Sequence, residues 1–368
     1  MKNDRRARIK EEADRLANSF VLAGAMPVET DSLLPADVLL DLYGEDIRSR
    51  TFVTYDPRIG EQMLRPDFTV PIVQLHMAEG AEPARYTYNG SVWRKQVGAR
   101  STEFTQVGYE LFDRTDPAAA DAEVFSIFAG MLASYGLKVS TGDMSILLAA
   151  VDGLHTTDRR RAALRRHVWR PIRFVKLLKL FSGVSQASET RTKLLGHVGV
   201  DGAEAILARA CAQQGLRSEE EVLARIAVLE EDALAKPMSR EESAMVETVL
   251  ALEGNSSDVL IKLRDMAASF PSLKAPADAM EDRLQALAAR RVDVDNLPFS
   301  ASFGRTNMEY YDGFVFGFTA KNHPNFPVVA SGGRYDALTQ VLGQGRSIAA
   351  VGGVIRPEVL VALQEEIA

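Results

Sequence analysis

The chain has 368 residues, 46% of them hydrophobic, and a formal net charge of −7. This length can bury a sizeable core and predicts two domains. The acidic excess argues against non-specific nucleic-acid binding, which needs Lys and Arg to neutralise phosphates.

Cysteine and histidine usage argues against metal sites and disulfides. Cys211 is the only cysteine in the sequence, which excludes an internal disulfide and a cysteine metal cluster. The five histidines are scattered without zinc-like spacing, so we expect no metal site. The charged N-terminus lacks the apolar core of a signal peptide, and no apolar run approaches the ~20 residues that span a bilayer. We therefore expect a cytoplasmic protein that does not contact a membrane.

Up to residue 152, helix-like and strand-like segments alternate. In chain order the sequence predicts a helix over 4–23 that Gly24 closes, a helix or a dimer-facing segment over 32–43, a strand over 52–56, a helix over 70–77, strands over 84–93 and 103–112, a helix over 118–135 that Gly136 closes, a strand over 137–145 and a helix over 146–152. Taken by itself, the Asp67-x-Thr69 sequence ahead of the 70–77 helix is most simply a helix cap.

The strands over 84–93 and 103–112 flank a polar loop, which is typical of a hairpin. Side chains alternate along the second strand, so Gln106 and Glu110 share one face with Gly108 between them. An amide and a carboxylate on either side of a glycine predict an open patch for a small cationic or hydrogen-bonding ligand, with Arg94 beside it. For a hairpin alone, a surface ladder of ion pairs is the simpler interpretation.

From about residue 155 to 292 the pattern is almost wholly helical, with Gly and Pro turn signals and no clear strand. Strands return over 292–300, 310–319 and 327–330, followed by the stretch SGGRYD over 331–336, a helix over 337–342, a strand over 349–355 and a helix over 357–366. This order predicts an α+β fold with a largely antiparallel sheet flanked by helices. We assign residues 1–152 and 293–368 to a discontinuous core and residues 153–292 to an all-helical insertion.

Short motifs spread over nearly the whole chain resemble, in order, the catalytic core of class II aminoacyl-tRNA synthetases, and most closely histidyl-tRNA synthetase. They are LRPDFT at 64–69 for the family's LRPEGT, the segment from 92 to 106 for motif 2, Gln106 and Glu110 for the QxxxE that follows, MEYYDGFVF at 308–316 for LDYYxGxVFE, GGRYD at 332–336, and residues 352–360 in the place of motif 3. The resemblance implies a class II synthetase-like fold of antiparallel sheet and helices.

The resemblance also implies a histidine site, built from the side chains at matching positions: Asp67, Thr69, Arg94, Gln106, Glu110, Tyr310 and Tyr311. A free amino acid needs acceptors for its ammonium group, a donor for its carboxylate and polar partners for its ring. Asp67, Gln106 and Glu110 would accept from the ammonium group, with Thr69 beside them. Arg94, at the motif 2 arginine, would meet a carboxylate or a phosphate. Tyr310 and Tyr311 would line the ring.

The positions that bind ATP in the synthetases differ in this chain. Thr306 stands where RGLDYY has its arginine, Val359 stands where motif 3 has its ATP-stacking arginine, and Arg356 replaces the preceding glycine. The motif 2 loop is shortened to residues 95–99. Losing one such cation costs ~3 kcal/mol or more of transition-state stabilisation, so we expect no adenylate formation and no catalytic residue. The sequence stops just after motif 3, so we also expect no anticodon-binding domain and no tRNA partner.

A histidine site without the ATP-binding arginines is the pattern of ATP phosphoribosyltransferase regulatory subunits, which this chain resembles in length, in LRPDxT and in motif 2. The resemblance implies a non-catalytic regulatory subunit, required for activity of the short-form catalytic subunit in the first step of histidine biosynthesis and for histidine feedback. It further implies a homodimer within a hetero-oligomer, free histidine as the effector, and no cofactor of its own.

Two other functions remain open. A scaffold would keep the acceptor side chains of the pocket only as an ion-pair network. A ligase would activate histidine or another amino acid for a non-tRNA acceptor, and would need other cations near the ATP site, such as Arg100, Arg334 or Arg356. Asp67 and Phe68 replace the family's glutamate and glycine on one wall of the pocket. This leaves open whether the regulatory histidine binds there or at a subunit contact.

Overall fold

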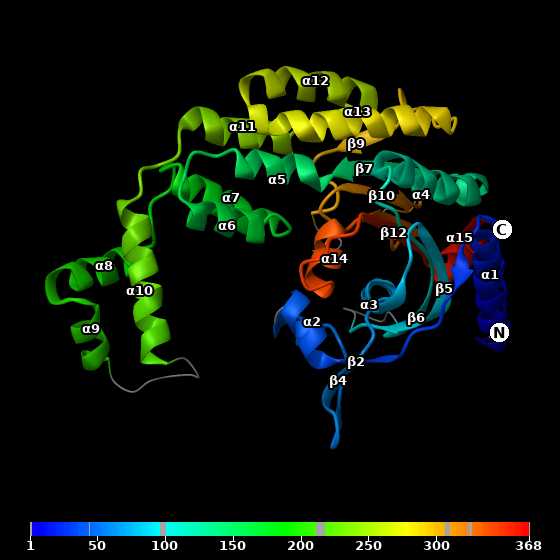
Figure 1. Cartoon of the computed structure of the whole chain (residues 1–368), viewed down its shortest axis with the longest axis horizontal. Coiled ribbons are helices and arrows are strands. Elements are labelled where there is room, and N and C mark those ends of the chain that lie inside the picture. The colour runs from blue at the N-terminus through cyan, green and yellow to red at the C-terminus, as the bar shows by residue number, and fades with distance from the viewer. Residues whose placement is uncertain are drawn as a thin grey trace. The chain divides into compact units, whose positions relative to one another are not determined.

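The computed structural model describes residues 2–43, 45–95, 101–210, 218–305, 310–321, 323 and 326–367. The chain divides into two compact units, one formed by Met1–Ile146 with Ala251–Ala368 and the other by Leu147–Leu250 (Figure 1). All the predicted site residues belong to the first unit.

The first unit is organised around a mixed sheet of nine strands in its described residues. In sheet order the strands are β1 (Met26–Pro27), β5 (Ala84–Trp93), β6 (Glu103–Phe112), β12 (Ala350–Ile355), β11 (Ala330–Arg334), β10 (Phe314–Thr319), β7 (Lys138–Asp143), β9 (Pro298–Ser300) and β8 (Glu253–Asn255). The pairs β1–β5 and β7–β9 are parallel, and the other neighbours are antiparallel. The predicted α+β fold with a largely antiparallel sheet is confirmed.

β6 is an interior strand of this sheet and lies between β5 and β12. Every residue over 106–112 is buried. β5 and β6 have the predicted bounds, because β-branched and aromatic residues favour strands whose faces are covered. Tyr88 lies opposite Gly108 across the β5–β6 pair, and Gly352 lies opposite Glu110 across the β12–β6 pair. This register decides which side chains can meet on the face of the predicted site.

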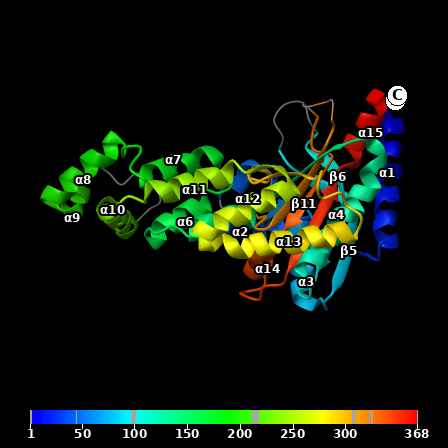
Figure 2. The same ribbon diagram turned by 90° about the horizontal axis from the view of Figure 1, so that it is seen from above.

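The sheet of the first unit is accompanied by helices. They are α1 (Lys2–Leu22), α2 (Ala36–Tyr43), α3 (Thr69–Glu79), α4 (Pro117–Leu132), α12 (Ser256–Ser269), α13 (Lys274–Ala289), α14 (Asp336–Leu342) and α15 (Pro357–Ile367), with short 3-10 turns η1 (Glu45–Ser49), η2 (Ala133–Tyr135) and η3 (Pro271–Leu273). α1 lies beside α15, and both contact β6 (Figures 1 and 2). The predicted helix stop at Gly136 is confirmed, because this residue takes a left-handed conformation at φ 59°.

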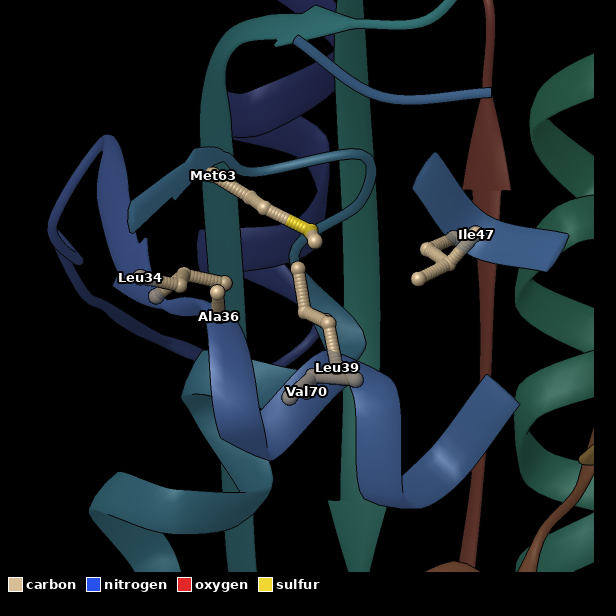
Figure 3. Packing of buried hydrophobic residues seen from close by; sticks show 6 residues of the cluster. All are labelled: Leu34, Ala36, Leu39, Ile47, Met63 and Val70. Atoms are coloured by element: carbon tan, nitrogen blue, oxygen red, sulfur yellow. The ribbon is translucent and has the colours of Figure 1, made fainter. Parts of the chain in front are cut away.

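A small second sheet precedes α3 in the first unit. Its strands are, in order, β2 (Leu33–Pro35), β4 (Gly60–Leu64) and β3 (Val53–Asp56). Apolar side chains from this sheet, α2, η1 and α3 form the buried cluster drawn in Figure 3, which consists of Leu34, Ala36, Leu39, Ile47, Met63 and Val70. Burial of Val70 fixes the first turn of α3, and this turn positions Thr69 and the preceding Asp67.

Two segments of the first unit differ from the predicted elements. Residues 32–43 are not one helix, because Leu33–Pro35 pairs with β4 and α2 begins only afterwards. The strand expected over 327–330 lies further along the chain as β11, and it includes most of the glycine-containing stretch over 331–336. Cβ atoms on Gly332 and Gly333 would come within 2.3 Å of the Phe316 ring and 2.9 Å of the Tyr311 ring. These positions need glycine because aromatic rings pack closely against them. Glycine has a low strand propensity, so the sequence pattern does not indicate a strand here.

The compact units also differ from the predicted boundaries at residues 152 and 293. α12, α13 and the short strand β8 belong to the first unit instead of a helical insertion. α13 packs along α4, and its Arg283 forms ion pairs with Asp121 at 3.5 Å and Asp143 at 2.6 Å. Helical periodicity does not reveal which neighbour a helix packs against, so the sequence did not separate these helices from those of the insertion.

The described secondary structure within Leu147–Leu250 is helical. The chain enters it through α5 (Met144–Asp152), and the remaining helices are α6 (Asp158–Arg166), α7 (Pro171–Phe181), α8 (Glu189–Asp201), α9 (Ala203–Arg209), α10 (Glu219–Leu234) and α11 (Arg240–Leu250). Arg160 of α6 and Arg191 of α8 both reach Asp232 of α10, at 2.5 and 2.6 Å. Across the described part of the chain, every helix is too short or too polar to span a bilayer.

Candidate functional site

The structure brings several predicted site residues together where α3 begins beside β6. The Thr69 hydroxyl donates a hydrogen bond to Glu110 Oε1 at 3.1 Å. The Tyr310 hydroxyl donates to Thr69 Oγ1 at 3.4 Å. The rings of Tyr310 and Tyr311 meet edge to face, with their centroids 4.9 Å apart. Residues that are 241 positions apart in the chain are therefore joined directly at this site.

Asp67 and Arg94 form the charged side of the site. Arg94 Nη2 lies 3.7 Å from Asp67 Oδ2, and Arg94 Nε donates to the Pro66 carbonyl at 2.6 Å. Asp67 Oδ1 also accepts from the Val70 backbone N–H at 3.4 Å, so the helix-cap interpretation is correct in part. Burial raises the pKa of Asp67, and the Arg94 charge only partly offsets this. Arg94 therefore supplies the expected opposite charge, but at a distance that leaves Asp67 incompletely compensated.

Glu110 is a buried carboxylate held by hydroxyl groups. It accepts from Tyr335 at 2.5 Å, from Thr69 at 3.1 Å and from Tyr88 at 3.5 Å. The pKa of Glu110 is raised to about 8, because burial and the charge of Asp67 together outweigh the opposing effect of these hydrogen bonds. Within the described ranges, no Lys or Arg forms an ion pair with Glu110. The donors to Glu110 are neutral hydroxyl groups, so a bound cation would supply the opposite charge that Glu110 lacks.

Gln106 lies on the same face of β6 as Glu110 and is also buried. Its Oε1 atom has no hydrogen-bond partner among the residues that the structure describes. Buried acceptors are almost always paired in folded proteins, so an orphaned one indicates a ligand, a water or another group that donates there. We call Asp67, Gln106 and Glu110 the acceptor cluster.

The expected open patch over Gly108 is wrong. A Cβ atom on Gly108 would come within 2.1 Å of Tyr88 Cζ and 2.2 Å of the Tyr88 hydroxyl oxygen. The Tyr88 ring thus fills the space between Gln106 and Glu110, and it stacks on Phe68 with the centroids 4.3 Å apart. The glycine serves a close approach by an aromatic ring rather than an open surface.

Sequence reasoning missed the roles of Tyr88 and Tyr335. Tyr88 is found only through the strand register that places it opposite Gly108. Tyr335 belongs to the GGRYD motif that carried the resemblance, and this membership was the available signal. Both hydroxyl groups donate to Glu110, so they help to set the charge state of the carboxylate.

The ligase alternative depends on where other arginines lie. Arg334 forms ion pairs with Asp121 at 2.7 Å and with Asp336 at 3.0 Å, so its charge is committed to structure. Arg100, the shortened loop after Lys95 and Thr306 lie outside the described residues.

Arg356 lies near the site. Burial, followed by the charge of Arg94, lowers the pKa of Arg356 to about 10, although Tyr311 and Glu358 oppose this change. Arg356, one of the cations that the ligase alternative would need, therefore lies close enough to Arg94 for their charges to interact. As for metals, no group of three or more His, Cys, Asp or Glu side chains in the described ranges is arranged to hold an ion.

Comparisons with known proteins identify the family. A family model for histidyl-tRNA synthetase matches residues 2–171 and 172–360. The ATP phosphoribosyltransferase regulatory subunit of Allorhizobium ampelinum is 32% identical over 361 residues, covering 92% of this chain and 94% of that protein. The chain belongs to the histidyl-tRNA synthetase-like family of ATP phosphoribosyltransferase regulatory subunits. The regulatory subunit of Brucella anthropi is 29% identical and covers 88% of this chain and 89% of its own length.

Solved structures show the same fold for this member of the family. An ATP phosphoribosyltransferase regulatory subunit/histidyl-tRNA synthetase from Bacillus halodurans matches with a TM-score of 0.67 and 20% identity, over 97% of this chain and 79% of that chain. Histidyl-tRNA synthetase from Nostoc sp. PCC 7120 matches with a TM-score of 0.63 and 16% identity, over 98% and 72%. The class II synthetase-like fold that the motifs predict is confirmed.

Proposed function

We propose that this chain is the non-catalytic regulatory subunit of an ATP phosphoribosyltransferase. It activates a short-form catalytic subunit in the first step of histidine biosynthesis, and free histidine bound at the acceptor cluster relays feedback. Family membership supports the regulatory role, since relatives of similar length carry that name. The chain would act as a homodimer within a cytoplasmic hetero-oligomer, without tRNA and without a cofactor of its own.

One observation carries the ligand assignment: the acceptor cluster contains two buried carboxyl groups, and its surroundings compensate little of the negative charge that these groups carry when ionised. Asp67 and Glu110 are 5% and 1% exposed, and the described ion pairs give them only the 3.7 Å contact between Asp67 and Arg94. Buried carboxylates in this state have raised pKa values, as both do here. The ammonium group of a free amino acid would supply a positive charge and three N–H donors.

The ring of the bound amino acid would lie against the aromatic side of the site. Tyr310 and Tyr311 are both nearly buried, and Tyr310 is linked through Thr69 to Glu110. A phenol can donate to or accept from an imidazole nitrogen, whereas an aliphatic side chain would leave it unpaired. Such polar partners favour histidine over apolar amino acids of similar size.

Feedback needs only a difference in histidine affinity between two states of the assembly. The acceptor cluster joins the start of α3 to β6, so a ligand there would bridge two parts of the first unit. A shift of α3 relative to β6 would change the Thr69–Glu110 contact and with it the affinity for histidine. This coupling is part of the proposal.

The function is tested by the initial rate of a short-form transferase measured with increasing amounts of this chain. We expect the rate to rise to a plateau at a fixed ratio of subunits, and added histidine to lower that plateau. Heat-denatured chain serves as the control. If the rate is the same at every ratio, the regulatory assignment is rejected.

A second candidate is the ligase, which the position of Arg356 near Arg94 favours because adenylate chemistry needs cations around a phosphate. Histidine-dependent exchange between ATP and pyrophosphate separates the two functions. We expect no exchange above the level of an Arg94→Ala variant, with a histidyl-tRNA synthetase as the positive control. Exchange that depends on Arg94 would support the ligase instead.

A further inference from the structure

The register of the sheet places Arg356 on the face of the acceptor cluster. Gly352 pairs with Glu110 and Val354 with Gly108, so this row of β12 faces the same side as the row on β6. The Arg356 backbone N–H donates to the Val329 carbonyl at 2.9 Å, which continues the ladder between β11 and β12 by one residue. Alternation along the strand therefore directs the Arg356 side chain to this face, next to Gln106.

Arg356 is half-buried, and its guanidinium forms one hydrogen bond with the residues that the structure describes. Its Nη1 donates to the Val328 carbonyl at 2.5 Å, and it forms no ion pair with a carboxylate among the described residues. Glu358, two positions later, is engaged by the Thr105 backbone N–H at 2.5 Å. A guanidinium presents five N–H donors in a planar fork that fits a carboxylate, so Arg356 has donors to offer an oxyanion.

Arg356 and Arg94 thus add a positive side to a site whose other side is negative. Arg94 contacts Asp67 at one edge of the acceptor cluster, and the two guanidinium groups are close enough to lower the pKa of Arg356. Acceptors on one side and guanidinium groups on the other match the two charged ends of a zwitterion. Repulsion between like charges favours an oxyanion between them.

We propose that Arg356 acts with Arg94 to bind the carboxylate of the amino acid held at the acceptor cluster. The assignment rests on the proposed function, because it takes the same ligand in the same site. It makes Arg356 a specificity-determining residue: it selects free α-amino acids over amines that lack the carboxylate. The synthetases have a glycine at the position of Arg356, and glycine has no side chain to bind a carboxylate. They also have an arginine at the position of Thr306, which this chain lacks.

The test compares histidine with histidinol, which keeps the ammonium group and the imidazole ring but has no carboxylate. Both ligands are titrated calorimetrically into the wild-type chain, Arg356→Ala and Arg356→Lys. We expect Arg356→Ala to weaken histidine binding about tenfold or more and to change histidinol binding by less than about twofold. Arg356→Lys should lose less histidine affinity than Arg356→Ala, because lysine keeps the positive charge but lacks the two-pronged donor geometry of the guanidinium. Arg114→Ala, which removes an exposed arginine paired with Glu82, is the matched control.

Each result decides between explanations. Equal losses for histidine and histidinol in Arg356→Ala would show a structural role and overturn the carboxylate assignment, as would no loss for either. If the wild type binds neither ligand, the amino-acid site itself fails, and the proposed function loses its effector. Inorganic phosphate distinguishes a general oxyanion site: competition with histidine but not with histidinol supports the assignment, and equal competition with both contradicts it. Thermal unfolding of each variant confirms that it is folded at the titration temperature.

Discussion

Gly352 lies directly opposite Glu110 across the β12–β6 pair, and a Cβ atom on it would come within 1.6 Å of Glu110 Oε2. The carboxylate of Glu110 therefore occupies the space that any other residue at 352 would need. This packing explains why a glycine is found in a fully buried strand, and it couples the sheet backbone to the charge state of the site.

Replacing Gly352 with alanine should destabilise the chain and weaken histidine binding. The added methyl group must displace Glu110 or separate the strands, and overpacking of this kind costs about 1–3 kcal/mol. Urea denaturation measures the effect. Gly130→Ala in α4 is the control, because a Cβ atom there has no neighbour within 4 Å and alanine favours a helix. Equal stability of the two variants would show that Glu110 does not lie against Gly352.

The buried Glu110 should make stability depend on pH. The folded chain keeps the proton on Glu110 up to a pKa of about 8, whereas an unperturbed glutamate releases it near 4.5. Since the folded state binds more protons between these values, raising the pH across this window lowers the contribution of Glu110 to the free energy of unfolding. Other groups titrate as well, so the informative quantity is the difference between the wild type and Glu110→Gln.

We expect the stability of the wild type relative to Glu110→Gln to decrease from pH 5 to pH 8 and to level off above that. Chemical denaturation at several pH values provides the measurement. A difference that stays constant across this range would mean that Glu110 is ionised in the folded chain and that burial does not control its proton.

Arg283 should be a major contributor to the stability of the first unit. Its side chain is 5% exposed and contacts Asp143, which is 1% exposed, and Asp121. Removing one member of a buried ion-pair network leaves an uncompensated charge, which costs about 3–5 kcal/mol. Arg283→Ala should therefore lower the unfolding midpoint far more than Arg114→Ala, whose side chain is exposed. Similar midpoints for both variants would contradict the network's role in fixing α13 to α4.

Much of the fold was predictable from the sequence because local patterns and chain order agree. The bounds of β5 and β6 follow from their runs of aromatic and β-branched residues. The motifs then indicated which distant segments meet, and the structure does join Tyr310 to Thr69 and Thr69 to Glu110. Site residues on regular strands and at helix starts are positioned by these elements, so their positions could be predicted once the elements were.

The rest depended on packing that no local pattern records. Tyr88 reaches across its strand pair to cover Gly108, which only the register reveals. β11 contains glycines that pack closely against aromatic rings, and glycine has a low strand propensity, so the sequence placed this strand at 327–330 instead of Ala330–Arg334. The position of Arg356 on the face of the acceptor cluster follows from a strand whose hydrogen-bond ladder continues one residue past its last assigned residue. Each of these features needs the sheet to be assembled before it can be seen.

Calorimetric titration of histidine into the isolated chain is the most direct test of the acceptor cluster as an amino-acid site. The experiment should be run at two temperatures, so that a binding enthalpy near zero at one of them does not hide the reaction. We expect saturable binding to a single class of sites, strongly weakened in Glu110→Gln. The absence of saturable heat at both temperatures would show that Asp67, Gln106 and Glu110 form only an internal polar network, and the effector role would be withdrawn.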